Sequence, residues 1–129
     1  MLLIDDDASL REIFSISLQL DGYLIKEAVN GQDALELLLK LPASELPDCI
    51  VLDLMMPVMN GNNFLDILRT DYGDRFSHIP VIVCSGQGRT PKPSHFSLLL
   101  EKPIQLFKLT QSVEAVLTPA PKTQTSALA

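Results

Sequence analysis

The chain is predicted to fold as a single α/β domain, with helices on both faces of a parallel sheet. Three short apolar runs end at charged residues: Met1–Ile4, Cys49–Leu52 before Asp53, and Leu98–Leu100 before Glu101. Continuous apolar runs are typical of strands buried on both faces of a parallel sheet, and segments with helical periodicity lie between them. The predicted fold class is therefore a doubly wound α/β sandwich with right-handed crossovers.

The composition is that of one globular domain. Hydrophobic residues make up 47% of the 129 residues and charged residues 20%. A net charge of -6 argues against direct binding to nucleic acid, which requires a basic patch. No apolar stretch reaches the ~18 residues of a membrane span and no signal peptide precedes the first strand, so we expect a cytoplasmic protein without membrane contact. Cys49 and Cys84 lie in apolar runs and are expected to be buried free thiols.

Helices and strands alternate through the first half of the chain. Helical spacing predicts a first helix that ends near Asp21–Gly22, and Tyr23–Ala28 is typical of a second strand. A turn signal at Asn30–Gly31 precedes the second helix, and Pro42 ends it. The apolar residues at helical spacing are Leu10, Ile13, Phe14 and Leu18 in the first helix and Ala34, Leu37, Leu38 and Leu41 in the second.

The second half continues the alternation. The loop Pro57–Gly61 follows the third strand, Ile79–Cys84 is typical of a fourth strand, and Pro103 precedes the last helix. The apolar residues at helical spacing are Phe64, Ile67 and Leu68 in the third helix and Leu106, Leu109, Val113, Val116 and Leu117 in the last. Residues 1–118 are expected to form the domain, and residues 119–129 a flexible tail or truncated linker.

The alternation breaks once, between the fourth and fifth strands. The segment Gly86–Phe96 holds two glycines and two prolines where a helix would be expected. In a helix interior glycine costs about 1 kcal/mol and proline about 3 kcal/mol relative to alanine. We therefore expect this fourth helix to be short or absent.

Charged side chains follow the strands at the points where they end. Because the carboxyl ends of parallel strands share one edge of a sheet, the side chains of Asp5, Asp6, Asp53 and Lys102 are expected to converge there. Crowded carboxylates repel one another unless a hard cation lies among them, and Mg²⁺ takes carboxylate, water and phosphate oxygens. The pattern predicts phosphoryl chemistry at this edge.

Together these features resemble the receiver domain of two-component response regulators, from Leu2 to about Leu117. The motifs that carry the resemblance are Asp5-Asp6-Asp7, Asp53-x-x-Met56-Pro57-x-x-x-Gly61, Ser85-Gly86 and Lys102-Pro103, each after a strand and in this order. The resemblance implies a flavodoxin-like sheet of five strands in the order 2-1-3-4-5. The glycines after the fourth strand are similar to those of receivers with a degenerate fourth helix.

The resemblance implies a phosphoryl-accepting switch. Asp53 is the implied acceptor, the donor is a histidine kinase or a histidine phosphotransfer protein, and phosphorylation alters binding to a downstream protein. Lys102 and Ser85 are the implied contacts of the phosphoryl oxygens. The implied Mg²⁺ ligands are Asp5, Asp6, Asp53 and the backbone carbonyl of Met55.

Other residues carry narrower expectations. Asp7 is expected to stabilise the amino end of the first helix. Leu99 stands three positions before the motif lysine, where the family has an aromatic switch residue, so ordering of the Gly86–Phe96 loop is a second hypothesis for the switch. Neither His78 nor His95 has metal-ligand spacing, and both are expected to be exposed in polar loops.

Two other functions stay open. A pseudo-receiver that binds partners without phosphorylation is consistent with Leu99 and the missing helix. A phosphohydrolase of the haloacid-dehalogenase type also uses an aspartate, Mg²⁺ and a lysine, but it requires an acid two positions after the nucleophile, where this chain has Met55. We therefore expect a regulatory domain rather than an enzyme. Phosphate uptake by Asp53 distinguishes a receiver from a pseudo-receiver.

Overall fold

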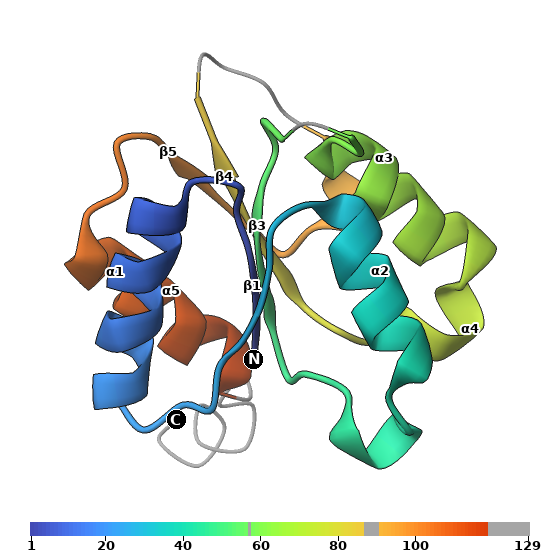
Figure 1. Cartoon of the computed structure of the whole chain (residues 1–129), viewed down its shortest axis with the longest axis horizontal. Coiled ribbons are helices and arrows are strands. Elements are labelled where there is room, and N and C mark those ends of the chain that lie inside the picture. The colour runs from blue at the N-terminus through green and yellow to red at the C-terminus, as the bar shows by residue number, and fades with distance from the viewer. Residues whose placement is uncertain (57, 87–90, 119–129) are drawn as a thin grey trace, which may run out of the picture.

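Five parallel strands form one sheet in a computed structural model of the chain (Figure 1). The structure describes residues 1–56, 58–86 and 91–118. The strand order is β2-β1-β3-β4-β5, which confirms the predicted order. The strands are β1 (Leu2–Ile4), β2 (Lys26–Ala28), β3 (Ile50–Asp53), β4 (Val81–Ser85) and β5 (Leu98–Glu101).

Helices cover both faces of the sheet. One face carries α1 (Ala8–Leu20) and α5 (Leu106–Leu117), and the other carries α2 (Gly31–Lys40), α3 (Gly61–Asp66) and α4 (Gly73–Phe76) (Figure 1). The shorter turns are the 3₁₀ turns η1 (Ala43–Glu45) and η3 (Pro93–His95) and the π-helical turn η2 (Ile67–Asp71). Within the described ranges, no helix has the length and apolar character needed to cross a membrane.

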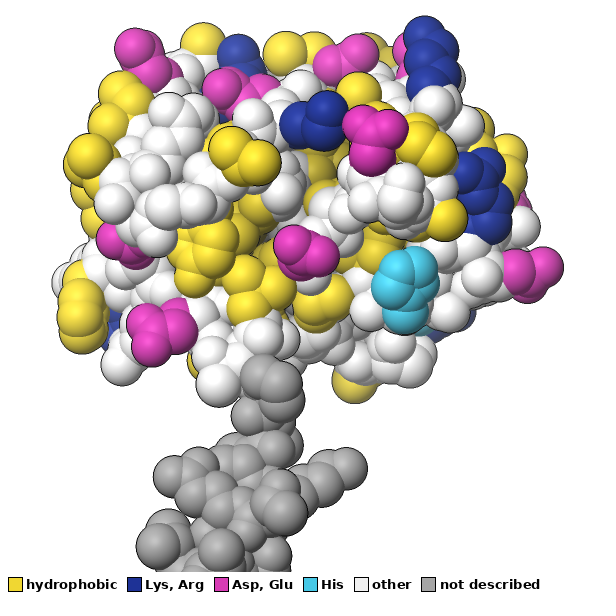
Figure 2. Space-filling view, turned by 90° about the horizontal axis from the view of Figure 1, so that it is seen from below, with side chains coloured by type: hydrophobic (Ala, Val, Ile, Leu, Met, Phe, Trp, Pro, Cys, Tyr) yellow, Lys and Arg dark blue, Asp and Glu magenta, His cyan; other side chains and the backbone are white. Residues whose placement is uncertain are grey.

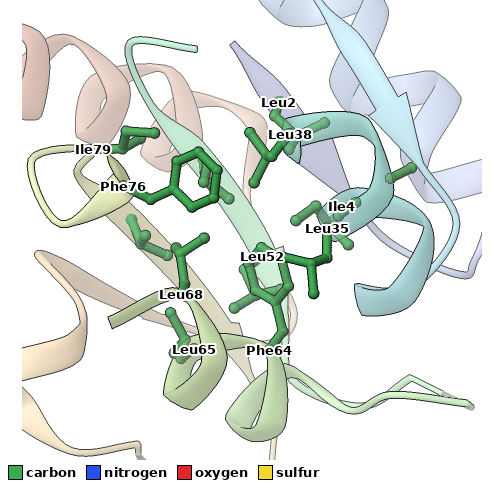
Figure 3. Packing of buried hydrophobic residues seen from close by; sticks show 14 of the residues in the cluster. Leu2, Ile4, Leu35, Leu38, Leu52, Phe64, Leu65, Leu68, Phe76 and Ile79 are labelled. Atoms are coloured by element: carbon green, nitrogen blue, oxygen red, sulfur yellow. The ribbon is translucent and has the colours of Figure 1, made fainter. Parts of the chain in front are cut away.

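Each face of the sheet has its own apolar core. Leu52 of β3 lies in the core beneath α2 and α3, among the buried side chains of Leu38, Phe64 and Phe76 (Figure 3). Its neighbour Val51 belongs to the core beneath α1 and α5, because successive side chains of a strand point to opposite faces. Full burial stabilises each such side chain by roughly 1.5–3 kcal/mol. The uninterrupted apolar runs of the sequence therefore reflect burial on both faces.

The second strand is shorter than predicted. The sequence predicts Tyr23–Ala28, but β2 pairs with β1 only from Lys26, which lies opposite Leu2. The side chain of Leu24 is 88% exposed, and its carbonyl accepts a hydrogen bond from the Met1 amino group. As an edge strand, β2 has a single neighbour, and that neighbour is three residues long.

The expected loss of the fourth helix is confirmed for the part of the β4–β5 connection that the structure describes. This part contains only the 3₁₀ turn η3. The helix labelled α4 lies before β4 and continues the third crossover after η2. Residues 87–90 of the expected loop lie outside the described residues.

Arg69 holds the end of this connection in place. Its Nε donates to the carbonyl of His95 at 3.1 Å and its Nη2 to that of Ile79 at 2.9 Å. Its Nη1 donates to the carbonyls of Phe76 and Ser77 at 3.0 and 2.9 Å. One guanidinium on η2 therefore ties together α4, the entry to β4 and η3. Burial lowers the pKa of Arg69.

His95 is buried, contrary to the expectation of an exposed loop histidine. Its residue is 8% exposed, and its Nδ1 lies 3.3 Å from Oδ1 of Asp66 on α3. Its amide donates to the carbonyl of Lys92. Local sequence does not reveal this burial, because the partners of His95 come from the preceding crossover.

Replacing Arg69 with methionine is expected to lower the free energy of unfolding by about 2–4 kcal/mol, because three partly buried carbonyls lose a charged donor at up to about 1–3 kcal/mol each. The matched control is Arg75→Met. Arg75 is exposed, and within the part of the chain that the structure describes it reaches one carbonyl, that of Leu41 at 3.4 Å, besides stacking over Phe76. Its loss is expected to cost less than about 1 kcal/mol. Urea unfolding followed by circular dichroism measures both, and equal losses would contradict the role of Arg69.

Candidate functional site

The candidate site lies at the carboxyl edge of the sheet. Asp53 and Ser85 are the last residues of β3 and β4, while Asp5 and Lys102 come directly after β1 and β5. The parallel register places these strand ends side by side, with Asp53 opposite the penultimate residue of β4. The topology therefore brings together side chains that are nearly a hundred residues apart in the sequence.

Lys102 and Asp53 form an ion pair at the centre of this edge. Lys102 Nζ lies 2.9 Å from Asp53 Oδ1, and the Met55 amide donates to the same oxygen at 3.1 Å. Burial alone lowers the pKa of Lys102, but the hydrogen bond to Asp53 and the charges of Asp53 and Asp5 outweigh it and raise the pKa. The lysine is therefore held as a cation. Its peptide bond to Pro103 is cis.

Three carboxylates form an acidic pocket beside this ion pair. One oxygen each of Asp5, Asp6 and Asp53 lies within 4.8 Å of the others. Asp5 and Asp53 are buried, whereas Asp6 is exposed. Burial, together with the charge of Asp53, raises the pKa of Asp5 to about 6, although a hydrogen bond from the Asp7 amide opposes the rise. A donor set of carboxylate oxygens with this concentrated charge fits a hard divalent cation such as Mg²⁺.

Local hydrogen bonds fix the backbone that follows the pocket residues, both at the start of α1 and after Asp53. Asp7 caps α1, because its Oδ1 accepts from the amides of Ser9 and Leu10 at 3.0 and 3.1 Å, so it stabilises the amino end of the helix as expected. After Asp53 the chain folds back until the Gly61 amide donates to the carbonyl of Leu54 at 3.0 Å. A Cβ at Gly61 would lie 2.7 Å from the Leu54 Cα, so only glycine allows this approach.

Of the remaining predicted residues, Ser85 lies at the same edge, whereas Leu99 lies within β5 and Phe96 before it. The Ser85 side chain is buried, and its hydroxyl lies 3.3 Å from the Gly86 carbonyl. Leu99 is half-buried against the core beneath α2 and α3, and Phe96 joins the same core. The position three residues before Lys102, where an aromatic switch residue is expected, is thus filled by the aliphatic side chain of Leu99. Pro57 of the motif lies outside the described residues.

Sequence reasoning missed Arg11. Its Nη1 donates to the main-chain carbonyl of Asp5 at 2.8 Å, and its Nε donates to Oε1 of Glu27 at 2.9 Å. These partners lie directly after β1 and in β2, so no local signal in the first helix identifies the contact. It places a cation against the backbone of the acidic pocket.

A separate hollow lies at the opposite end of the molecule. It has a volume of about 540 Å³ and is bordered by Met1, Tyr23, Leu24, Leu46 and Leu117 among others. Figure 2 shows this end from below, with apolar surface in the hollow. Its location at the amino ends of the strands separates it from the acidic pocket.

The fold and the site define a doubly wound α/β domain that presents an aspartate, a lysine and an acidic pocket at one sheet edge. The model of the response regulator receiver domain matches residues 1–114. The chain therefore belongs to the response regulator receiver family, a class of regulatory signal-transduction domains rather than conventional enzymes. The dehalogenase-type phosphohydrolase is thereby excluded.

Known relatives agree with this assignment. The chain is 36% identical over 89 residues to the DNA-binding dual master transcriptional regulator RpaA of Synechocystis sp., which covers 69% of this chain and 34% of that protein. It is 34% identical over 88 residues to the probable transcriptional regulator ycf27 of Guillardia theta, which covers 68% of this chain and 31% of that protein. The chain thus spans about a third of the length of these relatives.

Solved structures share the fold. The chemotaxis response regulator CheY4 of Vibrio cholerae has a TM-score of 0.77 at 28% identity, covering 90% of this chain and 96% of that chain. The receiver domain of the Francisella response regulator 1452 has a TM-score of 0.77 at 27% identity, covering 90% of this chain and 93% of that chain. The acidic pocket of this chain is consistent with phosphoryl-accepting two-component signalling.

Replacing Asp5 with asparagine is expected to stabilise the metal-free domain at neutral pH. The pKa of Asp5 is about 6 in the folded state against 3.8 in a free side chain, so the folded state binds the proton more tightly. The contribution of Asp5 to the free energy of unfolding therefore falls as pH rises from about 4 to about 6. Asp5→Asn removes this loss, worth about 1–3 kcal/mol at pH 7.5.

Urea unfolding in EDTA at pH 4.5 and pH 7.5 measures this difference. Asp48→Asn is the control, because Asp48 is an exposed acid outside the pocket. A gain for Asp5→Asn that is the same at both pH values would contradict the raised pKa.

Proposed function

We propose that this domain is a phosphoryl-accepting switch in which Asp53 receives a phosphoryl group from the phosphohistidine of a histidine kinase or a histidine phosphotransfer protein. One observation carries the proposal. At one edge of the sheet, the buried carboxylate of Asp53 lies 2.9 Å from Lys102 Nζ and beside the carboxylates of Asp5 and Asp6. A structural ion pair alone would not need two further carboxylates beside it, because they add repulsion. Receiver domains as a class are phosphorylated by histidine kinases.

Asp53 is the proposed nucleophile. One of its oxygens forms a bond to phosphorus while the bond between phosphorus and the donor imidazole nitrogen breaks, which leaves an acyl phosphate on the aspartate. The hydrogen bonds from Met55 and Lys102 to Oδ1 fix the orientation of the carboxylate before the reaction. Lys102 can then transfer its hydrogen bond to a phosphoryl oxygen, where charge develops.

Asp5, Asp6, Asp53 and the Met55 carbonyl are the proposed ligands of Mg²⁺. When bound, Mg²⁺ would supply positive charge to the carboxylates and to the phosphoryl oxygens. Because the pKa of Asp5 is about 6, protons compete for this site in mildly acidic solution, and ion binding is favoured above that pH. Ser85, which ends β4, is proposed to donate its hydroxyl to the phosphoryl group.

An exposed apolar surface on α1 and α5 suits a protein donor. Ile13 and Ile16 on α1 are 47% and 51% exposed, and Phe107 in the first turn of α5 is 70% exposed. The two helices lie side by side on one face of the sheet (Figure 1). We assign this surface to docking of the phosphodonor, since buried aromatic and aliphatic anchors supply most of the affinity of transient complexes.

The proposed switch segment is the connection from Ser85 to β5. Its end is already held by Arg69 and by Asp66, which contact His95. A new charge at Asp53 acts on the other end, at Ser85 and Gly86, so the response to phosphorylation is proposed to begin at that end. The sequence alone suggests that the whole Gly86–Phe96 loop responds to phosphorylation; the proposal now places the response at the Gly86 end.

Incubation with acetyl phosphate and Mg²⁺ tests the acceptor. Intact mass is expected to show one added phosphoryl group on the native chain and none on Asp53→Ala, while the exposed-acid control Asp48→Asn is modified normally. Lys102→Met is expected to slow the reaction by about 10²–10³-fold, because it removes a cation from the transferring group.

Absence of the added group in a native chain that binds Mg²⁺ would instead support the pseudo-receiver. An added group that persists in Asp53→Ala would assign the acceptor elsewhere.

Amide hydrogen exchange tests the switch segment. Beryllofluoride, an analogue of the phosphoryl group, is added with Mg²⁺. It is expected to slow amide exchange in peptides that cover residues 86–92. Exchange in peptides that cover residues 95–97 is expected to stay unchanged, because Arg69 already holds that end. Mg²⁺ alone is the control. Identical exchange in both conditions would contradict the proposal, and so would a change confined to residues 95–97.

A further inference from the structure

Arg11 links three elements behind the acidic pocket. It is the fourth residue of α1, and its side chain is only 17% exposed. Its Nη1 donates to the main-chain carbonyl of Asp5 at 2.8 Å, and its Nε donates to Oε1 of Glu27 on β2 at 2.9 Å. Both bonds involve a charged group, and such bonds are short and comparatively strong.

The Asp5 carbonyl belongs to the peptide group that joins Asp5 to Asp6. The pairing of β1 with its neighbours ends at Ile4, although the Asp5 amide still donates to the carbonyl of Ala28 at 3.2 Å. The orientation of the next peptide plane sets the direction in which the Asp6 side chain leaves the backbone. A donor on the Asp5 carbonyl fixes that plane where the strand ladder no longer does.

We propose that Arg11 is a positioning residue for the Mg²⁺ site, whose guanidinium orients the Asp5–Asp6 peptide so that both carboxylates face Asp53. This inference rests on the proposed function, because it assigns a role in the same pocket. Glu27 keeps the guanidinium in place by holding its Nε. The side chain of Asp7 acts on the adjacent turn instead, through its cap on α1, while its amide donates to Oδ1 of Asp5.

The charge of Arg11 and its geometry predict opposite effects. A cation behind a cation-binding pocket repels Mg²⁺, so electrostatics alone predicts that removing Arg11 tightens Mg²⁺ binding. Removing a positioning contact weakens binding instead, because the ligands then have to be ordered by the ion itself. Partners of metal ligands typically change metal affinity by about 10–100-fold when they are lost. The sign of the change therefore distinguishes the two roles.

The test is calorimetric titration of MgCl₂ into the native chain, Arg11→Met and Glu27→Gln. Arg11→Met has a similar side-chain length without donors, and about 10-fold weaker Mg²⁺ binding is expected. Glu27→Gln retains an oxygen that can accept from Nε, so its Mg²⁺ affinity is expected to stay within about twofold of native. Thermal melts in EDTA verify that each variant is folded at the titration temperature.

Phosphorylation by acetyl phosphate supplies a second readout. In Arg11→Met the Mg²⁺ concentration at half-maximal rate is expected to rise about 10-fold, with a much smaller fall in the rate at saturating Mg²⁺. A merely structural role would lower the melting temperature and leave the half-saturating Mg²⁺ concentration unchanged.

Unchanged or tighter Mg²⁺ binding in Arg11→Met, beside a native chain that binds Mg²⁺ and accepts phosphate, would overturn the role of Arg11 alone. A native chain that neither binds Mg²⁺ nor accepts phosphate would overturn the proposed function and this inference with it.

Discussion

Negative charge concentrated at the carboxyl edge of the sheet is the constraint on which the rest of the domain depends. Two of the three pocket carboxylates, those of Asp5 and Asp53, are buried, and burial of an ionised carboxylate is unfavourable without a partner. Lys102 offsets part of this charge, and a divalent cation can offset more. Burial of side chains in the two apolar cores offsets the unfavourable free energy of the buried carboxylates at this edge. Any change of charge at Asp53 therefore alters the electrostatic interactions of Asp5, Asp6 and Lys102 directly.

Two partly buried cations in the domain have different tasks. Lys102 bonds to a side-chain oxygen of Asp53, and its own amide donates to the Ser85 carbonyl, so it joins the acceptor strand to the strand that begins the switch segment. It can exchange one oxygen partner for another. Arg69 instead donates to four main-chain carbonyls, whose positions are fixed by the fold. The first cation suits a site that changes state, and the second suits an anchor for the described end of the β4–β5 connection.

The sequence predicted the fold and the pocket because both follow from local patterns and one geometric rule. Buried strands are recognisable as apolar runs, and parallel strands must place their carboxyl ends together, so Asp53 and Lys102 could be paired without coordinates. The strand Tyr23–Ala28 was predicted too long because an edge strand's pairing is set by the length of its neighbour. His95 was expected to be exposed because its partners are distant in the sequence.

By itself, the sequence determined the order of elements, the interrupted fourth crossover and the residue types at the sheet edge, since each of these is encoded within a few neighbouring positions. Only the tertiary structure decided how deeply each carboxylate is buried, and hence the raised pKa of Asp5. It also decided which main-chain groups Arg11 and Arg69 hold. Burial and hydrogen-bond partners depend on segments that meet only after the sheet has formed, and no local pattern records them.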